Sequence, residues 1–543
     1  MLIIIPMSGI GKRFIEAGYT DPKPLIKVDG KPIIEHVVNL FPGEHNFIFI
    51  CNQEHLQTTA MYDILQKIAP TGTIVGIPKH KKGPVFAVSQ IMNLIDNNEE
   101  VIVNYCDFSM AWDYNDFLRT TRARHADGAI PSYKGFHPHM LHDPNYAFIK
   151  DEAEWLLEIK EKAPFTDNKM NEYASTGTYY FKRGALIKKY FPELMDLDIN
   201  INGEYYVSLV YNLLQRDGLN VSVYPVQHML QWGTPNDLAE YNDWSAYFAQ
   251  AVRPQKLQKP LHDLMLIPLA GRGQRFAQEG YGNPKPLIPV SGKPMIVQAA
   301  ASLPPSSNHI FVCLKEHLEH YPLEQAIKKN YPNALIKKLD QVTQGQACTC
   351  EYGLQGIDPE KSLIIGACDN GMLWNQETYE KLMADPTVDV IAWSFRNHPS
   401  SKKNPQMYGW LDVDEHNTVT KVSVKIPLSS DPSNDHAIVG TFTFKKAAYF
   451  LQATQNLYQK NIRINNEFYV DSCIGEAIAM GLTVKVFEVD HYICWGTPND
   501  LRTFNYWQQF FHQCWWHPYR MENDPTVAQK TEDSKPKNQW ISQ

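Results

Sequence analysis

The sequence has no long apolar run, and this absence restricts the class of protein. Across 543 residues no stretch approaches the roughly 18 apolar residues of a membrane-spanning helix. Residues 1–6 lack the basic segment and the length of a secretory signal. The nine cysteines are an odd number without a Cys-x-x-Cys pair, which disfavours a disulfide framework or a zinc site. We therefore expect reduced core thiols in a cytoplasmic protein with no membrane span.

Positive charge is also in short supply. The chain carries 51 Lys and Arg against 59 Asp and Glu, a formal net charge of −8. Proteins that bind nucleic acid in general carry a basic face, so we expect no nucleic-acid partner. A local basic pocket for a small anionic substrate stays open, because net charge does not describe a single pocket.

What the sequence does contain is a long repeat. The segment 7–14, Met-Ser-Gly-Ile-Gly-Lys-Arg-Phe, is answered by Leu-Ala-Gly-Arg-Gly-Gln-Arg-Phe at 269–276, a displacement of 262 residues. Asp-Pro-Lys-Pro-Leu-Ile and Gly-Lys-Pro recur at the same displacement. This interval is too long for a solenoid repeat, so a whole domain is duplicated. The expected organisation is a domain at 1–250, a linker at 251–262, a domain at 263–520, and a polar, disordered tail at 521–543.

Short apolar runs alternate with amphipathic segments in both halves. The pattern predicts strands at 2–7, 47–51, 73–77 and 101–107, helices at 33–41, 85–95 and 116–124, and the same order in the second half. Such alternation favours an α/β fold with a mostly parallel sheet covered on both faces. The displacement becomes 263 by Lys162 and Lys425, which indicates one inserted residue in the loops around 136–165.

A glycine-bearing loop follows the first strand of each half. Two glycines in each copy allow a phosphate to approach the backbone closely, Gly9 and Gly11 in the first and Gly271 and Gly273 in the second. The third glycine of the dinucleotide fingerprint is missing. A cationic pair follows each loop at the same spacing, Arg13 with Lys23 and Arg275 with Lys285. A guanidinium and an ammonium there predict neutralisation of a triphosphate and its transition state.

Two aspartates end matching apolar runs. Asp107 and Asp369 each follow a cysteine at the predicted carboxyl end of a strand, where open α/β sheets place their ligands. A carboxylate there can hold Mg²⁺ or Mn²⁺ against phosphates. A helix-capping role is the alternative for a single copy, and the matched pair favours the metal role.

These motifs resemble the signature of the sugar-1-phosphate nucleotidyltransferases, the NTP transferase family. The resemblance rests on Gly-x-Gly-x-Arg, Pro-Lys-Pro-Leu and Gly-Lys-Pro, and on Trp-Gly-Thr-Pro-Asn-Asp-Leu at 232–238 and 495–501. It implies two tandem Rossmann-like, doubly wound mixed sheets of the GT-A-like type. It also implies transfer of a nucleotidyl group from an NTP to a phosphorylated acceptor, foremost a sugar 1-phosphate, with Mg²⁺ and release of pyrophosphate. The expected product would serve glycan or surface polysaccharide precursor synthesis.

The resemblance carries further site residues over by position. It implies nucleotide contacts at Gly83, Gln344 and Gly345, and acceptor contacts at Lys162, Gly177, Glu204, Lys425, Gly440 and Glu467. Two positions depart from the family pattern. Gln231 and Cys494 stand where a second metal-binding acid is usual, so Glu204 and Glu467 are alternative metal ligands. Val424 replaces the glutamate that the first half has at Glu161.

Three rival interpretations stay open. One half can be catalytic while the other is regulatory or degenerate. A nucleotide-sugar glycosyltransferase would need an Asp-x-Asp motif, which Asp107-Phe108-Ser109 and Asp369-Asn370-Gly371 do not supply. A nucleotide-binding protein without turnover is disfavoured by the persistence of Arg, Lys and Asp in both copies. Association into a homo-oligomer is compatible with the sequence.

Overall fold

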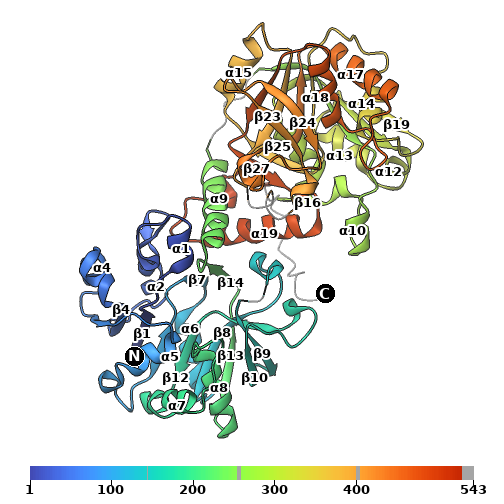
Figure 1. The fold of residues 1–543 in the computed structure, drawn as a ribbon. Helices are drawn as coiled ribbons and strands as arrows, with labels where there is room; N and C mark the ends of the chain where they lie inside the picture. The colour runs from blue at the N-terminus through green and yellow to red at the C-terminus, as the bar shows by residue number, and fades with distance from the viewer. Residues whose placement is uncertain (144, 254–258, 399–400, 402–403, 529–543) are drawn as a thin grey trace. The chain divides into compact units, whose positions relative to one another are not determined.

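The chain divides into two α/β units, which we call unit 1 (Met1–Ser245) and unit 2 (Ala246–Gln543). The computed structural model describes residues 1–143, 145–253, 259–398, 401 and 404–528 (Figure 1). The strands of unit 1 are β1 (Leu2–Met7), β2 (Lys27–Val28), β3 (Lys31–Pro32), β4 (Phe47–Asn52), β5 (Thr73–Ile77), β6 (Val101–Asn104), β7 (Phe108–Ala111), β8 (Gly128–Tyr133), β9 (Ala147–Glu152), β10 (Trp155–Glu161), β11 (Tyr173–Ser175), β12 (Thr178–Phe181), β13 (Val221–Pro225) and β14 (His228–Gln231). Its α-helices are α1 (Lys12–Glu16), α2 (Ile33–Val38), α3 (Gln53–Thr58), α4 (Met61–Ile68), α5 (Gly83–Ser89), α6 (Tyr114–Ala123), α7 (Gly184–Asp196), α8 (Val207–Arg216) and α9 (Pro235–Ala251), the last of which continues past Ser245.

Unit 2 repeats this series of elements. Its strands are β15 (His262–Leu269), β16 (Pro289–Val290), β17 (Lys293–Pro294), β18 (Ser306–Leu314), β19 (Leu335–Leu339), β20 (Leu363–Ile365), β21 (Asn370–Leu373), β22 (Val390–Phe395), β23 (Gly409–Val413), β24 (Val419–Val424), β25 (His436–Phe444), β26 (Val484–Glu488) and β27 (His491–Cys494). Its α-helices are α10 (Gln274–Gln278), α11 (Met295–Ala301), α12 (Lys315–His320), α13 (Leu323–Asn330), α14 (Gln346–Gly353), α15 (Gln376–Ala384), α17 (Ala447–Lys460), α18 (Val470–Ala479) and α19 (Pro498–Gln513).

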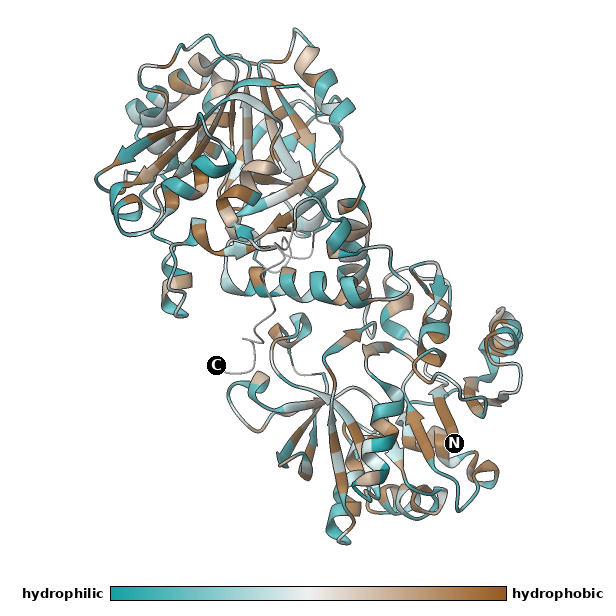
Figure 2. Cartoon of the chain, turned by 180° about the vertical axis from the view of Figure 1, so that it is seen from behind, coloured by the Kyte–Doolittle hydropathy of each residue, from teal (hydrophilic) through white to brown (hydrophobic). Residues whose placement is uncertain are grey.

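The main sheets of the two units share one strand order. Unit 1 contains the path β5-β4-β1-β6-β12-β8-β13, and unit 2 contains β19-β18-β15-β20-β25-β22-β26. The central strands β1, β4, β5 and β6 are parallel, whereas β12 runs antiparallel to both of its neighbours. The sheets are therefore mixed, and the predicted fold class of two doubly wound α/β sheets is confirmed. In Figure 2 the strands of each sheet carry the strongest hydrophobic colouring.

Both faces of each sheet are covered. Leu264 and Leu266 belong to one apolar core with α14, α17 and α18, while Met265 and Ile267 belong to a second core with α11 and α13. Successive side chains of a strand point to opposite faces, so β15 is buried on both sides. This explains its continuous apolar sequence, which is typical of a central parallel strand.

Several predicted elements are shorter than their apolar patterns, among them the helix expected at 33–41, which ends at Val38. The helix expected at 85–95 ends at Ser89 and is followed by a 3-10 turn, Met92–Leu94, while Ile91 and Ile95 still reach the core. The strand expected at 101–107 ends at Asn104, three residues before Asp107. Its end coincides with the antiparallel partner β12, where Asn104 pairs with Thr178.

Strand pairing locates the residue that is inserted between the repeats. Glu161 stands opposite Ala147 in unit 1, and Val424 stands opposite Gly409 in unit 2. The displacement is thus 262 on the first strand of this hairpin and 263 on the second. The extra residue lies in the hairpin turn, inside the predicted region 136–165.

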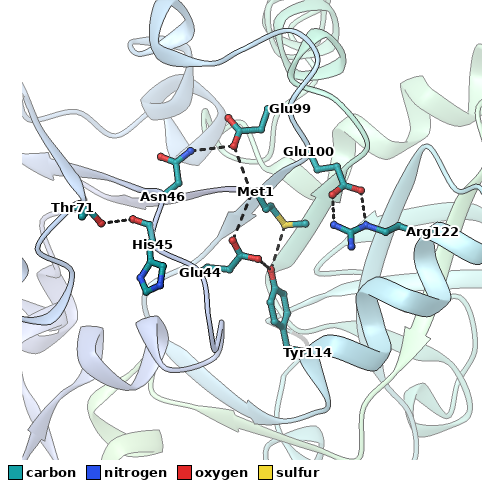
Figure 3. Close-up of polar contacts among 9 residues, drawn as sticks. All are labelled: Met1, Glu44, His45, Asn46, Thr71, Glu99, Glu100, Tyr114 and Arg122. Carbon is teal, nitrogen blue, oxygen red and sulfur yellow. Dashed lines mark hydrogen bonds and ion pairs between the residues drawn. The ribbon is translucent and has the colours of Figure 1, made fainter.

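Carboxylates at the amino ends of the parallel strands anchor helix α6 in unit 1. Glu44, before β4, accepts a hydrogen bond from the hydroxyl of Tyr114 (2.8 Å). Glu100, before β6, accepts from Nε of Arg122 (2.9 Å), as Figure 3 shows. These contacts tie helix α6 to the edge at which β4 and β6 begin.

The end of unit 2 differs from the sequence prediction. The segment from Met521, expected to be disordered, forms a 3-10 turn at Met521–Asn523 and is ordered as far as Ala528. Its backbone carbonyls accept hydrogen bonds from Lys293 (3.1 Å, to Pro525) and Gln298 (2.8 Å, to Thr526). Polar composition favours disorder only where the chain finds no partners. The remainder of the predicted tail, 529–543, and residues 254–258 of the predicted linker lie outside the described residues.

All nine cysteines are free thiols, and five of them are buried. Of the cysteines expected in the core from apolar runs, Cys51 and Cys313 are buried, whereas Cys106 and Cys368 are only partly buried. Among the helices of the described residues, none combines the length and the apolar character needed to span a bilayer.

Candidate active site

The glycine loop joins β1 to α1 in unit 1 and β15 to α10 in unit 2. The second glycine of each loop has a positive φ, 69° at Gly11 and 63° at Gly273, which glycine adopts without strain. The first glycine, Gly9 or Gly271, is explained by the space beside it and not by its φ. A Cβ atom added there would meet nothing within 4 Å, so the backbone faces open space. These two positions leave the approach free for a phosphate.

A lysine and an aspartate pair beside each loop. In unit 1, Nζ of Lys23 donates to Oδ2 of Asp107 (2.6 Å) and to the carbonyl of Gly233 (3.3 Å). In unit 2, Lys285 pairs with Asp369 in the same way. Burial opposes the charged form of Lys285, but the carboxylate of Asp369 outweighs it and raises the pKa of this lysine. Each lysine thus forms an ion pair with an aspartate at the carboxyl end of the central strands.

The two arginines of the glycine loops are also placed to bind phosphate. Arg13 and Arg275 are exposed at the start of α1 and α10, and each lines a cavity of its unit. Within the part of the chain that the structure describes, no carboxylate forms an ion pair with either guanidinium. A guanidinium that is not neutralised by the protein is free to bind phosphate oxygens in a bidentate manner.

The predicted acceptor lysines share an unusual backbone. Lys162 and Lys425 are non-glycine residues with positive φ, 57° and 67°. Such strain costs about 1–3 kcal/mol and is typical of functional sites. Nζ of Lys162 donates to the hydroxyl of Tyr206 (2.8 Å), which in turn contacts Glu204. Nζ of Lys425 donates to the carbonyl of Met407 (2.8 Å), and burial lowers its pKa.

Gly83 and Gly345, the glycines predicted to contact the nucleotide, let the loops before α5 and α14 pack closely against a second segment. A Cβ added to Gly345 would lie 2.5 Å from the backbone N and O of Phe468, and one added to Gly83 would lie 2.7 Å from those of Tyr205. Phe468 donates to the carbonyl of Gln344 (2.9 Å) and accepts from Ala347 (3.0 Å). This close approach places the segment with Glu204 or Glu467 beside the loop that precedes α5 or α14.

Many of the predicted residues line one cavity in each unit, but Gly9, Gly11 and Gly83 do not line the cavity of unit 1. Unit 1 has a cavity of about 270 Å³ whose lining includes the predicted residues Arg13, Lys23, Asp107, Lys162, Gly177 and Glu204. Unit 2 has a cavity of about 890 Å³ lined in part by Gly271, Gly273, Arg275, Lys285, Asp369, Lys425, Gly440 and Glu467. An adjoining cavity of about 280 Å³ in unit 2 contains Gly345 and Gln346.

Gln344 lies apart from this group. Its side-chain oxygen accepts from Arg463 (2.6 Å), and it lines a separate cavity with Cys348, Tyr458 and Phe468. The neighbouring Gln346 lies in the cavity with Gly345 instead.

Sequence reasoning missed three kinds of residue in the site. Tyr206 and Tyr469 line the cavities beside the acceptor lysines. Asp237, from Gly-Thr-Pro-Asn-Asp, accepts from Thr234 (2.6 Å) and Gln231 (2.7 Å), and burial raises its pKa to about 6. Asp471 lines the unit 2 cavity beside Lys425. Comparison of the repeats could have revealed Asp471, because unit 1 has Ser208 in its place.

Part of the chain matches a known protein family. Residues 3–201 match the model of the nucleotidyl transferase family. A curated relative, the bifunctional protein GlmU of Methanocaldococcus jannaschii, is 22% identical over 189 residues, which are 34% of this chain and 41% of the relative. The chain thus spans about two fifths of the length of that relative.

Several solved structures are similar to part of the chain. The nucleoside-diphosphate-sugar pyrophosphorylase of Vibrio cholerae RC9 is 22% identical, with 44% of this chain and 99% of that chain covered and a TM-score of 0.38. The inositol-1-phosphate CTP transferase of T. maritima is 13% identical, with 47% and 99% covered and a TM-score of 0.37. A putative glucose-1-phosphate thymidylyltransferase of Bacillus anthracis is 18% identical, with 45% and 94% covered and a TM-score of 0.36.

Proposed function

We propose that each unit transfers a nucleotidyl group from an NTP to a phosphorylated acceptor and releases pyrophosphate. The observation that carries this proposal is the lysine–aspartate pair beside a glycine loop, present in unit 1 as Lys23 with Asp107 and in unit 2 as Lys285 with Asp369. An arginine without an ion-pair partner in the described structure stands at each loop. Two independent copies of one phosphate-binding arrangement support two active sites.

The chemistry needs little beyond positioning and charge. An oxygen of the acceptor phosphate attacks the α-phosphorus of the NTP, and a new P–O bond forms. The bond from the α-phosphorus to the bridging oxygen breaks, and its electron pair leaves with pyrophosphate. The attacking oxygen is already anionic, so no strong base is required. Arg13 and Lys23, or Arg275 and Lys285, would neutralise the α-phosphate and the leaving group.

The site fits a divalent ion that is held largely by substrate. Within the described residues, no three His, Cys, Asp or Glu side chains form a group that could bind a metal. At the predicted metal position each unit has one carboxylate, Asp107 or Asp369, and a lysine occupies one of its oxygens. Mg²⁺ usually retains phosphate and water ligands and uses only one or two carboxylates, so this donor set suits Mg²⁺, or Mn²⁺, brought with the NTP. When bound, the ion would neutralise phosphate charge.

The other wall of the cavity suits a phosphorylated polyol, foremost a sugar 1-phosphate. Lys162 supplies a cation for the acceptor phosphate in unit 1, with Glu204 and Glu161 in the same cavity. Carboxylates are good acceptors for sugar hydroxyls. A nucleotide sugar made in this way would serve glycan precursor synthesis.

The test is pyrophosphate release by the full chain across a panel of NTPs and sugar 1-phosphates. We expect release with at least one pair, complete dependence on Mg²⁺ or Mn²⁺, and about a 10²-fold or greater loss in the Asp107→Asn/Asp369→Asn double variant. Glu415→Gln, at a carboxylate whose side chain is 88% exposed, is the control and should leave the rate unchanged. NTP binding without pyrophosphate release for any acceptor would overturn the proposal.

A further inference from the structure

The acceptor side of the two cavities differs at three neighbouring positions. In unit 1, Glu161 at the end of β10 lines the cavity, and Oγ of Ser208 on α8 donates to its carboxylate (2.6 Å). Ala147 of β9 stands opposite Glu161. Lys162 follows directly, so a carboxylate and a lysine come from the same strand end.

Unit 2 also places a carboxylate and a lysine in its cavity, but the carboxylate comes from a different position in the repeat. Val424 occupies the end of β24, where unit 1 has Glu161. Asp471, in the first turn of α18, occupies the position of Ser208. Glu161 and Val424 are 263 residues apart, and so are Ser208 and Asp471. This is the displacement that relates Lys162 to Lys425. The carboxylate is absent from the strand and present on the helix.

The third position makes room for this change. Gly409 pairs with Val424 and corresponds to Ala147. A Cβ added to Gly409 would overlap the carboxylate of Asp471 and would lie 2.8 Å from Cδ1 of Ile438. Gly409 has no positive φ that would require glycine, so the structure explains it by the space that these two side chains occupy, with Asp471 the nearer.

Asp471 lies within the electrostatic range of the acceptor lysine. It lines the same cavity as Lys425, Arg275 and Glu467. Burial raises the pKa of Asp471 to about 6, and the charge of Lys425 opposes this rise. Burial likewise raises the pKa of Glu161 in unit 1, where Ser208 and Lys162 oppose it. The two carboxylates therefore share an environment as well as a place in the cavity.

We propose that Asp471 is the acceptor-binding carboxylate of unit 2, in the role that Glu161 has in unit 1. Both units then offer a carboxylate and a lysine to the same class of ligand, a phosphorylated polyol. The loss of the glutamate at Val424 is compensated and does not mark unit 2 as degenerate. This inference rests on the proposed function for the identity of the ligand.

The test measures binding of glucose 1-phosphate to the full chain by calorimetry. Lys162→Ala serves as the parent, so that the remaining binding belongs to unit 2. In this parent, Asp471→Asn is expected to weaken binding by about tenfold or more, the loss of one hydrogen bond to a charged group. Gly409→Ala should weaken it similarly, because the added methyl group displaces the carboxylate while the charge at the start of α18 remains. Glu415→Gln should have no effect.

A triple variant that moves the carboxylate back to the strand separates an effect on binding from an effect on folding. Gly409→Ala/Val424→Glu/Asp471→Ser rebuilds the unit 1 arrangement in unit 2 and is expected to restore binding toward that of the parent. Unchanged binding in Asp471→Asn, or no binding of glucose 1-phosphate by the parent, would overturn the inference. Loss of binding in Asp471→Asn without pyrophosphate release by the wild type would keep Asp471 as a ligand-binding residue and overturn the proposed transfer reaction instead.

Discussion

At the scale of single residues, the glycines of the site fall into two groups with different consequences. Gly345 has a φ of 137° and lies against the backbone of Phe468, whereas Gly271 has open space around it and no positive φ. We predict that Gly345→Ala destabilises unit 2 by about 1–3 kcal/mol, from backbone strain alone. Gly271→Ala should leave stability unchanged and weaken NTP binding, because only the approach of a phosphate is obstructed.

Thermal unfolding and NTP titration of the two variants check this assignment. Equal stability of both variants would contradict the close packing at Gly345. Undiminished NTP affinity in Gly271→Ala would contradict a phosphate site at the glycine loop.

The recurrence of single residues made much of the site predictable. Lys23 and Asp107 are 84 residues apart, yet Lys23 could be placed near the glycine loop and Asp107 at the carboxyl end of a strand, and the structure pairs them. Asp471 was missed because a motif search asks whether Glu161 is retained and not whether its charge has moved to a helix, although alignment of Ser208 with Asp471 would have revealed it. Contacts that depend on the backbone, such as Gly83 with Tyr205, left no signal in side-chain chemistry either.

At the scale of elements, unit 1 contains a pH-sensitive packing arrangement. His137 precedes the 3-10 turn Pro138–Leu141, and His228 opens β14, and both are buried. Burial lowers the pKa of His137 to about 3 and that of His228 to about 4. In the unfolded chain both would titrate near the ordinary value of about 6.5. The free energy of unfolding of unit 1 is therefore highest above about pH 6.5, where both histidines are neutral in the folded and the unfolded chain. It falls as the pH drops toward 4, because the unfolded chain binds protons that the buried histidines do not.

We predict that unit 1 loses about 1.4 kcal/mol of stability per histidine for each pH unit below 6.5. Hydrogen exchange of strand β6 in the full chain, followed from pH 7 to pH 5, measures this loss. His228→Gln should remove the contribution of one histidine from the slope of stability against pH. His416→Gln, at a side chain that is 76% exposed, should leave this slope unchanged. A slope that is the same in His228→Gln would contradict the account.

The ordered end of unit 2 gives a second prediction at this scale. Residues 525–528 supply hydrogen-bond partners to Lys293, Gln298 and Ser291 around the turn between β16 and β17. A chain ending at Arg520 should lose about 1–3 kcal/mol of unit 2 stability, as expected for a few hydrogen bonds. A chain ending at Ala528 keeps these contacts and is the matched control. Identical unfolding of the two chains would contradict a stabilising role for this segment. Composition predicted disorder here because it does not register backbone carbonyls as acceptors.

At the scale of the whole molecule, the duplication provides two sites that use the same charges. The glycine loop, the arginine and the lysine–aspartate pair are retained in both units, while the acceptor sides have diverged. In unit 1, a Cβ on Gly177 would lie 3.1 Å from the ring of Phe108. In unit 2, a Cβ on Gly440 would lie 3.6 Å from the small side chain of Ala367. The cavities therefore differ in the shape that they offer to an acceptor more than in their charge.

The most direct measurement is the rate of pyrophosphate release by Arg13→Ala, by Arg275→Ala and by the double variant, over the same panel of NTPs and sugar 1-phosphates. We predict that each single variant loses the products of one unit by about 10²–10³-fold and keeps those of the other, while the double variant loses both. Lys12→Ala, at a side chain that is 77% exposed and adjacent to Arg13, should behave as the wild type. Full activity in both single variants and in the double variant would contradict two arginine-dependent active sites.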